Sequence, residues 1–174
     1  MHSGASSPRA RLTFALMTFL LLGLPVQVWS DDGVLARATL KGITAIRVGV
    51  ERLPPEAERD GLTRDQLQTD VEARLRKAGI KVTSTSVENK VSPYLHLNVS
   101  TVKNPPGFYA FNIRLEFNQG VILERNRNVL VPAPTWSIDF LGTVGAQRLR
   151  DVRSTVAAGL DKFINAYLEQ NPKP

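Results

Sequence analysis

Side chains suited to acid–base or metal chemistry are scarce in this chain of 174 residues. It has two histidines, His2 and His96, and no cysteine. Nucleophilic catalysis needs a nucleophile, a base and an orienting group, and zinc is held mostly by His and Cys. Neither Gly-x-Ser-x-Gly nor His-Glu-x-x-His occurs. We therefore expect no catalytic residue, no metal site and no cofactor; an enzyme of unknown reaction is the alternative.

Two polar groups remain as candidates for such chemistry. His96 lies in a segment where polar and apolar residues alternate, on the polar side, which indicates a solvated surface histidine. The loop 52–60 carries Glu56, Glu58 and Asp60 together with two arginines, Arg52 and Arg59. That arrangement is typical of solvated charge rather than of paired catalytic carboxylates.

A second candidate site is an anion-binding turn. Gly142 and Gly145 precede an apolar-periodic segment, and backbone N–H groups at a helix start favour anions. Arg148 and Arg153 follow on that segment. These four residues make a carrier of an anionic lipid or glycan an alternative function. The competing interpretation is a strand-to-helix turn followed by a solvated helical face.

Residues 1–30 have the three-part pattern of a secretory signal peptide. Arg9 and Arg11 precede an apolar run at 12–24, and Val28-Trp29-Ser30 resembles a cleavage site before Asp31. The apolar run is shorter than the ~20 residues that span a bilayer. We expect cleavage after Ser30 and a periplasmic or secreted protein; retention of the segment as an anchor is the alternative. The absence of cysteine favours the periplasm.

The charge and hydropathy of the remaining segment, 31–174, limit the classes of partner that we expect. Removal of Arg9 and Arg11 leaves twenty basic and sixteen acidic residues, a net charge of +4. This modest positive net charge favours solubility and does not indicate a particular partner. No later segment is apolar enough to span a membrane, and export excludes nucleic acid as the expected partner.

The hydropathy pattern predicts one α+β domain at 42–171, after a lead-in at 31–41 and before a tail at 172–174. Alternation predicts strands at 42–53, 80–85, 94–102, 108–117 with a continuation at 121–124, and 129–141. Two segments with helical period complete the order β-α-β-β-β-β-α. We expect a two-layer sandwich in which two helices cover one face of a mostly antiparallel sheet of four or five strands.

The first helix is the best-defined predicted element. Thr63 and Gln66 have the form of a capping box. Leu67, Val71 and Leu75 then recur at a spacing of four, which makes one apolar stripe. Gly79 is placed to end the helix in a left-handed conformation.

The polar alternates of the strands form the predicted partner-binding surface. Two helices cannot easily cover both faces of such a sheet, so one face stays open. That face is expected to present His96, Asn98, Asn112, Arg114 and Glu116. Pro132 and Pro134 indicate that the last strand is an edge, where a partner strand could also add.

The segments 67–82, 94–102 and 152–172 resemble, in order and type, small periplasmic accessory domains of bacterial envelope machinery. Examples are the lipopolysaccharide-assembly lipoprotein partner and the N-terminal domain of the Tol-system propeller protein. The segments Pro-Tyr-Leu-x-Leu-x-Val and Thr-Trp are also similar to those of uncharacterised exported bacterial proteins. The resemblance implies a non-catalytic binding or adaptor domain with an envelope protein as partner. The lipobox cysteine of the lipoprotein relatives is missing here.

Overall fold

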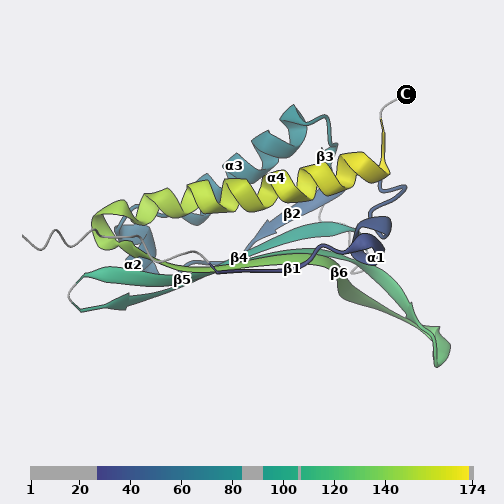
Figure 1. Cartoon of the computed structure of the whole chain (residues 1–174), viewed down its shortest axis with the longest axis horizontal. Helices are drawn as coiled ribbons and strands as arrows, with labels where there is room; N and C mark the ends of the chain where they lie inside the picture. Colours follow the sequence, from purple (N-terminus) through teal and green to yellow (C-terminus); the bar gives the residue numbers. More distant parts are fainter. Residues whose placement is uncertain (1–26, 84–91, 106, 173–174) are drawn as a thin grey trace, which may run out of the picture.

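A computed structural model describes residues 27–83, 92–105 and 107–172 of the chain. Within these ranges the chain forms a six-stranded sheet of order β1-β6-β5-β4-β2-β3. The strands are β1 Gln27–Asp31, β2 Ile46–Val50, β3 Val82–Thr83, β4 Tyr94–Asn104, β5 Phe108–Leu123 and β6 Asn126–Gly145. The helices are α1 Val34–Ala38, α2 Pro55–Arg59, α3 Arg64–Lys77, the 3-10 helix η1 Ala146–Asp151 and α4 Val152–Gln170. The long helices α3 and α4 lie on one side of the sheet (Figure 1).

The sheet is mixed, which corrects the expected mostly antiparallel sheet of four or five strands with two helices. Strands β4, β5, β6 and β1 are antiparallel neighbours. Strand β2, however, is parallel to both β3 and β4. Helix α3 connects β2 to β3, and a helical crossover returns the chain in its original direction. Alternation identifies strands but does not give their direction, so the sequence pattern left this feature open.

Three short elements were not expected. Strand β1 pairs with β6, from Gln27 opposite Leu141 to Asp31 opposite Ser137, in a region read as the end of a signal peptide. Helix α1 lies within the predicted lead-in, and α2 begins at Pro55 in the predicted loop. Five-residue elements carry too little periodicity to be recognised. The apolar run 12–24 lies outside the described residues, as do most of the predicted tail and the end of the predicted strand 80–85.

The predicted turn at 142–145 is wrong, because β6 continues through it to Gly145. Gly142 lies opposite Phe111 in the sheet, and a Cβ atom added to Gly142 would lie 2.8 Å from the Phe111 ring. The glycine therefore leaves space for an aromatic ring. The β5–β6 turn lies at 124–125, so β6 begins at Asn126, three residues before the predicted strand 129–141. A register shift between Phe117 and Asn118 leaves one extra residue, Thr135, on β6.

Helix α3 follows its prediction closely. The Thr63 side chain accepts a hydrogen bond from the Gln66 N–H at 3.4 Å, and Leu67, Val71 and Leu75 are buried. Gly79 has φ of 82° and ends the helix. No helix among the described residues is long and apolar enough to cross a membrane.

Aromatic rings pack together in the core under the helices. Trp136 and Phe117 on the sheet pack against Phe163 of α4, with ring centroids 5.1 and 5.5 Å from the Phe163 ring. Trp136 and Tyr109 are almost fully buried, as expected for core residues. The Trp136 indole N–H donates to Asp32, and Arg37 bonds both Asp32 and Glu169 of α4. This network fixes the segment after β1 to the sheet and to the last helix.

Candidate binding face of the sheet

The helix-free face of the sheet carries a shallow polar hollow of about 400 Å³. It forms because β2, β4 and β5 are neighbours, and alternate residues of a strand point to the same face. The opposite alternates, such as Leu97 and Leu115, are buried under the helices. The hollow is lined by Glu51, His96, Asn98, Ser100, Asn112, Arg114 and Glu116.

His96 is at the centre of the hollow and is half-buried, with 24% of its side chain exposed. Its Nε2 atom lies 3.1 Å from a carboxylate oxygen of Glu51, and its Nδ1 atom lies 3.7 Å from one of Glu116. The expected orientation away from the helices is confirmed. The side chain is held between two carboxylates, however, rather than freely solvated as the alternation pattern indicated.

Asn98 and Ser100 extend the hydrogen-bonded set along β4. The Asn98 amide donates to Glu51, and the Ser100 hydroxyl donates to Asn98 at 2.9 Å. These bonds link β4 to the residue after β2 and continue along β4. The polar groups are therefore held in place in the unbound chain. An ordered polar surface loses less entropy on binding than one whose side chains are free.

Arg114 supplies the positive charge at the other side of the hollow. Its Nε atom donates to Asp139 of β6 at 2.7 Å and lies 3.9 Å from Glu116. The hydrogen bond to Asp139 and the Coulombic attraction of that carboxylate raise the pKa of Arg114. With 54% of its side chain exposed, Arg114 still presents guanidinium N–H groups to solvent.

The hollow is suited to binding by hydrogen bonds and charge. Glu51 and Glu116 offer carboxylate oxygens, Arg114 offers donors, and Asn112 offers both kinds of group. Within the described residues no group of three or more His, Asp or Glu side chains is placed to hold a metal ion. The two carboxylates contact opposite nitrogen atoms of the His96 ring and do not converge on one point.

All five residues predicted to bind a partner line this one hollow. Glu51 was expected to point outward on its strand, but nothing in the sequence placed it beside His96. That neighbourhood depends on the parallel pairing of β2 with β4, in which Gly49 lies opposite His96. Asp139 was likewise missed, because its register with Arg114 depends on the bulge after Phe117.

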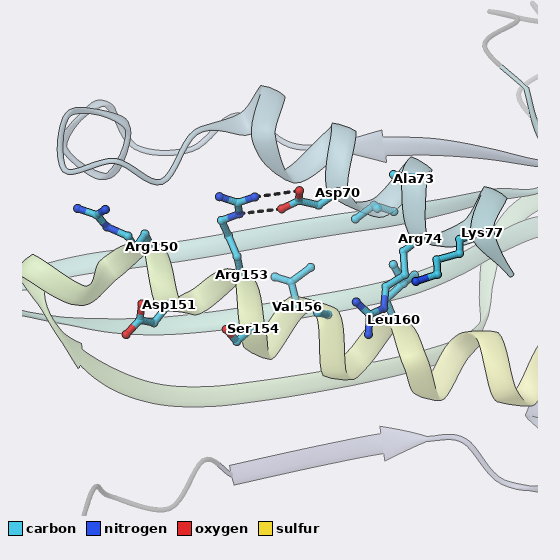
Figure 2. A pocket seen from close by; sticks show the side chains of 12 residues that line it. Asp70, Ala73, Arg74, Lys77, Arg150, Asp151, Arg153, Ser154, Val156 and Leu160 are labelled. Atoms are coloured by element: carbon cyan, nitrogen blue, oxygen red, sulfur yellow. Dashed lines mark hydrogen bonds and ion pairs between the residues drawn. The ribbon is translucent and has the colours of Figure 1, made fainter.

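The four residues of the predicted anion site are not gathered around a turn. Gly142 and Gly145 belong to β6, and Arg148 lies on η1, where it pairs with Asp151 at 2.8 Å. Arg153 lies on α4 and makes two hydrogen bonds to Asp70 of α3, at 2.7 and 2.9 Å. Arg153 lines the groove between α3 and α4 (Figure 2).

This groove has a volume of about 550 Å³ and mixed chemistry. Figure 2 shows the Arg153–Asp70 pair joining the two helices, with Arg150 near one end and Lys77 near the other. A second bridge, from Arg74 to Asp161, also joins α3 to α4, at 2.6 and 2.7 Å. The floor residues Val71, Val156 and Leu160 are almost fully buried. The groove is therefore closed beneath by apolar side chains, and charged groups of both signs line its sides.

The acidic loop forms another polar hollow, lined in part by Asp60 and Lys103. Asp60 accepts hydrogen bonds from Lys103 and from the buried Tyr109 hydroxyl, both at 2.7 Å. The bond from Lys103, followed by that from Tyr109, lowers the pKa of Asp60. This carboxylate is thus paired rather than solvated.

No family model and no curated protein sequence matches this chain. A proposal for its function must therefore rest on its own residues and their geometry.

Proposed function

We propose that this chain is an exported, non-catalytic binding or adaptor domain of the bacterial cell envelope, and that it binds a protein partner through the helix-free face of its sheet. The observation that carries the proposal is the single hollow around His96, which collects polar side chains from β4, from β5 and from the residue after β2. The opposite face of the same strands is filled by α3, α4 and the aromatic core.

The charges of the hollow indicate the kind of partner surface. Glu51 and Glu116 line the hollow with one arginine, Arg114, which also pairs with Asp139, so carboxylate oxygens outnumber cationic groups there. A partner with Arg or Lys side chains flanked by amide groups would complement it. Charge complementarity of this kind contributes to specificity and to the rate of association.

Export is the second part of the proposal. It rests on the signal-peptide pattern of residues 1–30 and on the resemblance to periplasmic accessory domains. The periplasm or the extracellular space would then be the place where the partner is met, and an envelope protein is the expected partner class.

The test is a pull-down from envelope extracts with the exported chain as bait. The double variant Asn112→Lys with Arg114→Glu changes the hollow but no core residue, so the fold should persist while capture of the partner falls at least tenfold. Arg148→Glu is the matched control, because Arg148 is 78% exposed and lies on η1, outside the hollow. Equal capture by the double variant and the wild type would contradict the proposal.

A carrier of an anionic ligand is the second candidate, favoured by the groove between α3 and α4. Arg150 and Lys77 line the groove beside the bridged Arg153 and Arg74. An anionic headgroup or glycan could contact these bases without entering the core. Binding of the chain to vesicles containing phosphatidylglycerol, lost in Lys77→Glu with Arg150→Glu and retained in the Asn112/Arg114 double variant, would support this function instead.

A further inference from the structure

Strand β1 covers part of the outer edge of β6, and its side chains contribute little to the core. Its five residues are all exposed, including Val28 at 43% and Trp29 at 54%. It is held by pairing with residues 137–141 of β6 rather than by burial of its side chains. The predicted signal cleavage after Ser30 would remove four of its five residues.

We propose that, after removal of residues 1–30, the freed edge of β6 pairs with the same edge of a second copy of this chain. The result would be an antiparallel β6–β6 dimer centred on Leu141. The proposal rests on signal cleavage as part of the proposed function. It adds an interface separate from the polar hollow.

The extent of the free edge limits where two copies of β6 can pair. Residues before Ser137 are covered by the segment after β1: Trp136 bonds Asp32, and the Thr135 carbonyl accepts a bond from the Thr39 hydroxyl. Asp31 stays opposite Ser137. The edge freed by cleavage thus runs from Ile138 to the end of β6 at Gly145. A two-fold axis at Leu141 pairs residues 138–144 of both copies, and no other centre on this edge pairs more residues.

Side-chain chemistry favours the same register. On the helix-free face Leu141, 43% exposed, would meet its own copy, and Asp139 would lie opposite Thr143. On the other face Phe140 would lie opposite Gly142 and Ile138 opposite Val144. Centring the pair on Asp139 instead would place two carboxylates directly opposite one another, which destabilises a strand pair. It would also shorten the pairing to residues 138–140.

Because β1 pairs antiparallel with this edge of β6, the edge is compatible with antiparallel pairing. An exposed strand edge is a template for pairing with another chain, and a two-fold axis makes such pairing self-complementary. Because an axis perpendicular to the sheet keeps both helix-free faces on the same side, the two polar hollows would share one continuous surface. A dimer would therefore present two binding hollows together.

The test uses the exported chain, first sequenced from its N-terminus and then examined by sedimentation. We expect a chain that begins at Asp31 and sediments as a dimer. Leu141→Lys should shift it to a monomer, because two ammonium groups would meet on the axis. Ile122→Lys, on the exposed β5–β6 hairpin (Ile122 is 62% exposed), is the matched control and should remain dimeric.

Cross-linking tests the register, because the chain has no cysteine of its own. Opposite residues of paired strands have Cα atoms about 4.5–5.5 Å apart, within the range of a disulfide. Leu141→Cys should therefore form a cross-linked dimer under mild oxidation. Thr143→Cys should not, since the two copies of residue 143 would be offset by four residues, roughly 14 Å.

Three results would overturn the dimer. They are an exported chain that retains Gln27–Ser30, a monomer at all concentrations tested, or cross-linking through Thr143→Cys in preference to Leu141→Cys. Loss of partner capture in the Asn112/Arg114 double variant with sedimentation unchanged concerns the polar hollow alone, so the two proposals fail separately.

Discussion

The two faces of the sheet are built from the same strands but differ in almost every physical property. On the covered face, Leu97, Leu115 and Trp136 are at most 1% exposed and pack against the helices. On the other face, one residue away along the strands, His96, Arg114 and Glu116 remain partly exposed and bond to one another or to neighbouring carboxylates. Residues that stabilise the fold therefore alternate along each strand with residues that could bind a partner. A substitution should therefore affect stability or binding according to the face on which it falls.

The largest expected effect is on the covered face, in helix α3. Val71→Asp places a carboxylate where the side chain is 1% exposed, and the nearby Arg74 and Arg153 are already paired with other carboxylates. We expect a loss of about 3–5 kcal/mol in the free energy of unfolding, measured by urea titration. Thr69→Asp, on the exposed side of the same helix, should change it by less than about 0.5 kcal/mol. Equal effects would mean that the buried face of α3 has been misidentified.

A smaller effect is expected where α4 meets the sheet. A Cβ atom added to Gly159 would lie 2.8 Å from the Phe140 ring. Gly159→Ala should therefore destabilise the protein by about 1–3 kcal/mol through overpacking, although alanine is the better helix former. Thermal melting measures the change. An increase in melting temperature would show that the ring moves aside at little cost.

The ion pair between Arg74 of α3 and Asp161 of α4 makes the stability of the helical layer depend on pH. The hydrogen bond from Arg74 lowers the pKa of Asp161 below its value in the unfolded chain. The resulting stabilisation is complete above the unfolded value of about 3.9 and is lost as the pH falls through the folded value. Asp161→Asn should thus be less stable than wild type at pH 7, and the difference should narrow below about pH 4. A difference that stays constant from pH 7 to pH 3 would exclude this contribution.

The smallest effect on stability is expected in the hollow. His96→Ala removes a side chain that contacts Glu51 and Glu116 on a partly exposed face. Its cost should be below about 1 kcal/mol in urea titration, as for other exposed charge contacts. A cost above about 2 kcal/mol would point to a structural histidine and would weaken the contrast between the faces.

Sequence alone predicted the elements whose pattern is long and regular. Helix α3 has a stripe, a cap and a terminal glycine, and the alternation around His96 correctly assigned residues to the two faces. Pairing was harder, because β2 acquires its parallel direction from the crossover through α3 and not from its own residues. Strand β1 is short and overlaps the predicted signal peptide, so nothing in its composition marked it as part of a sheet.

The candidate site shows the same limit. Five of its residues were predicted from alternation, because each strand reveals its own polar side. Glu51 and Asp139 complete the charge pattern, and both enter through contacts between strands, parallel pairing for one and a bulge for the other. Pro132 and Pro134 were taken to mark an edge strand. Among the described residues β6 has β1 outside it, and both prolines lie beyond the residues that β1 pairs with.

The position of the tryptophans has a spectroscopic consequence. The chain contains two, Trp29 and Trp136. Trp29 is 54% exposed on β1, whereas Trp136 is 1% exposed and its indole N–H is bonded to Asp32. Cleavage after Ser30 would leave a single buried indole, whose emission lies at shorter wavelength than that of an indole in water. Intrinsic fluorescence would then distinguish the precursor from the processed chain without a label, and its red shift on unfolding would report the opening of one defined place, the contact between β6 and α4.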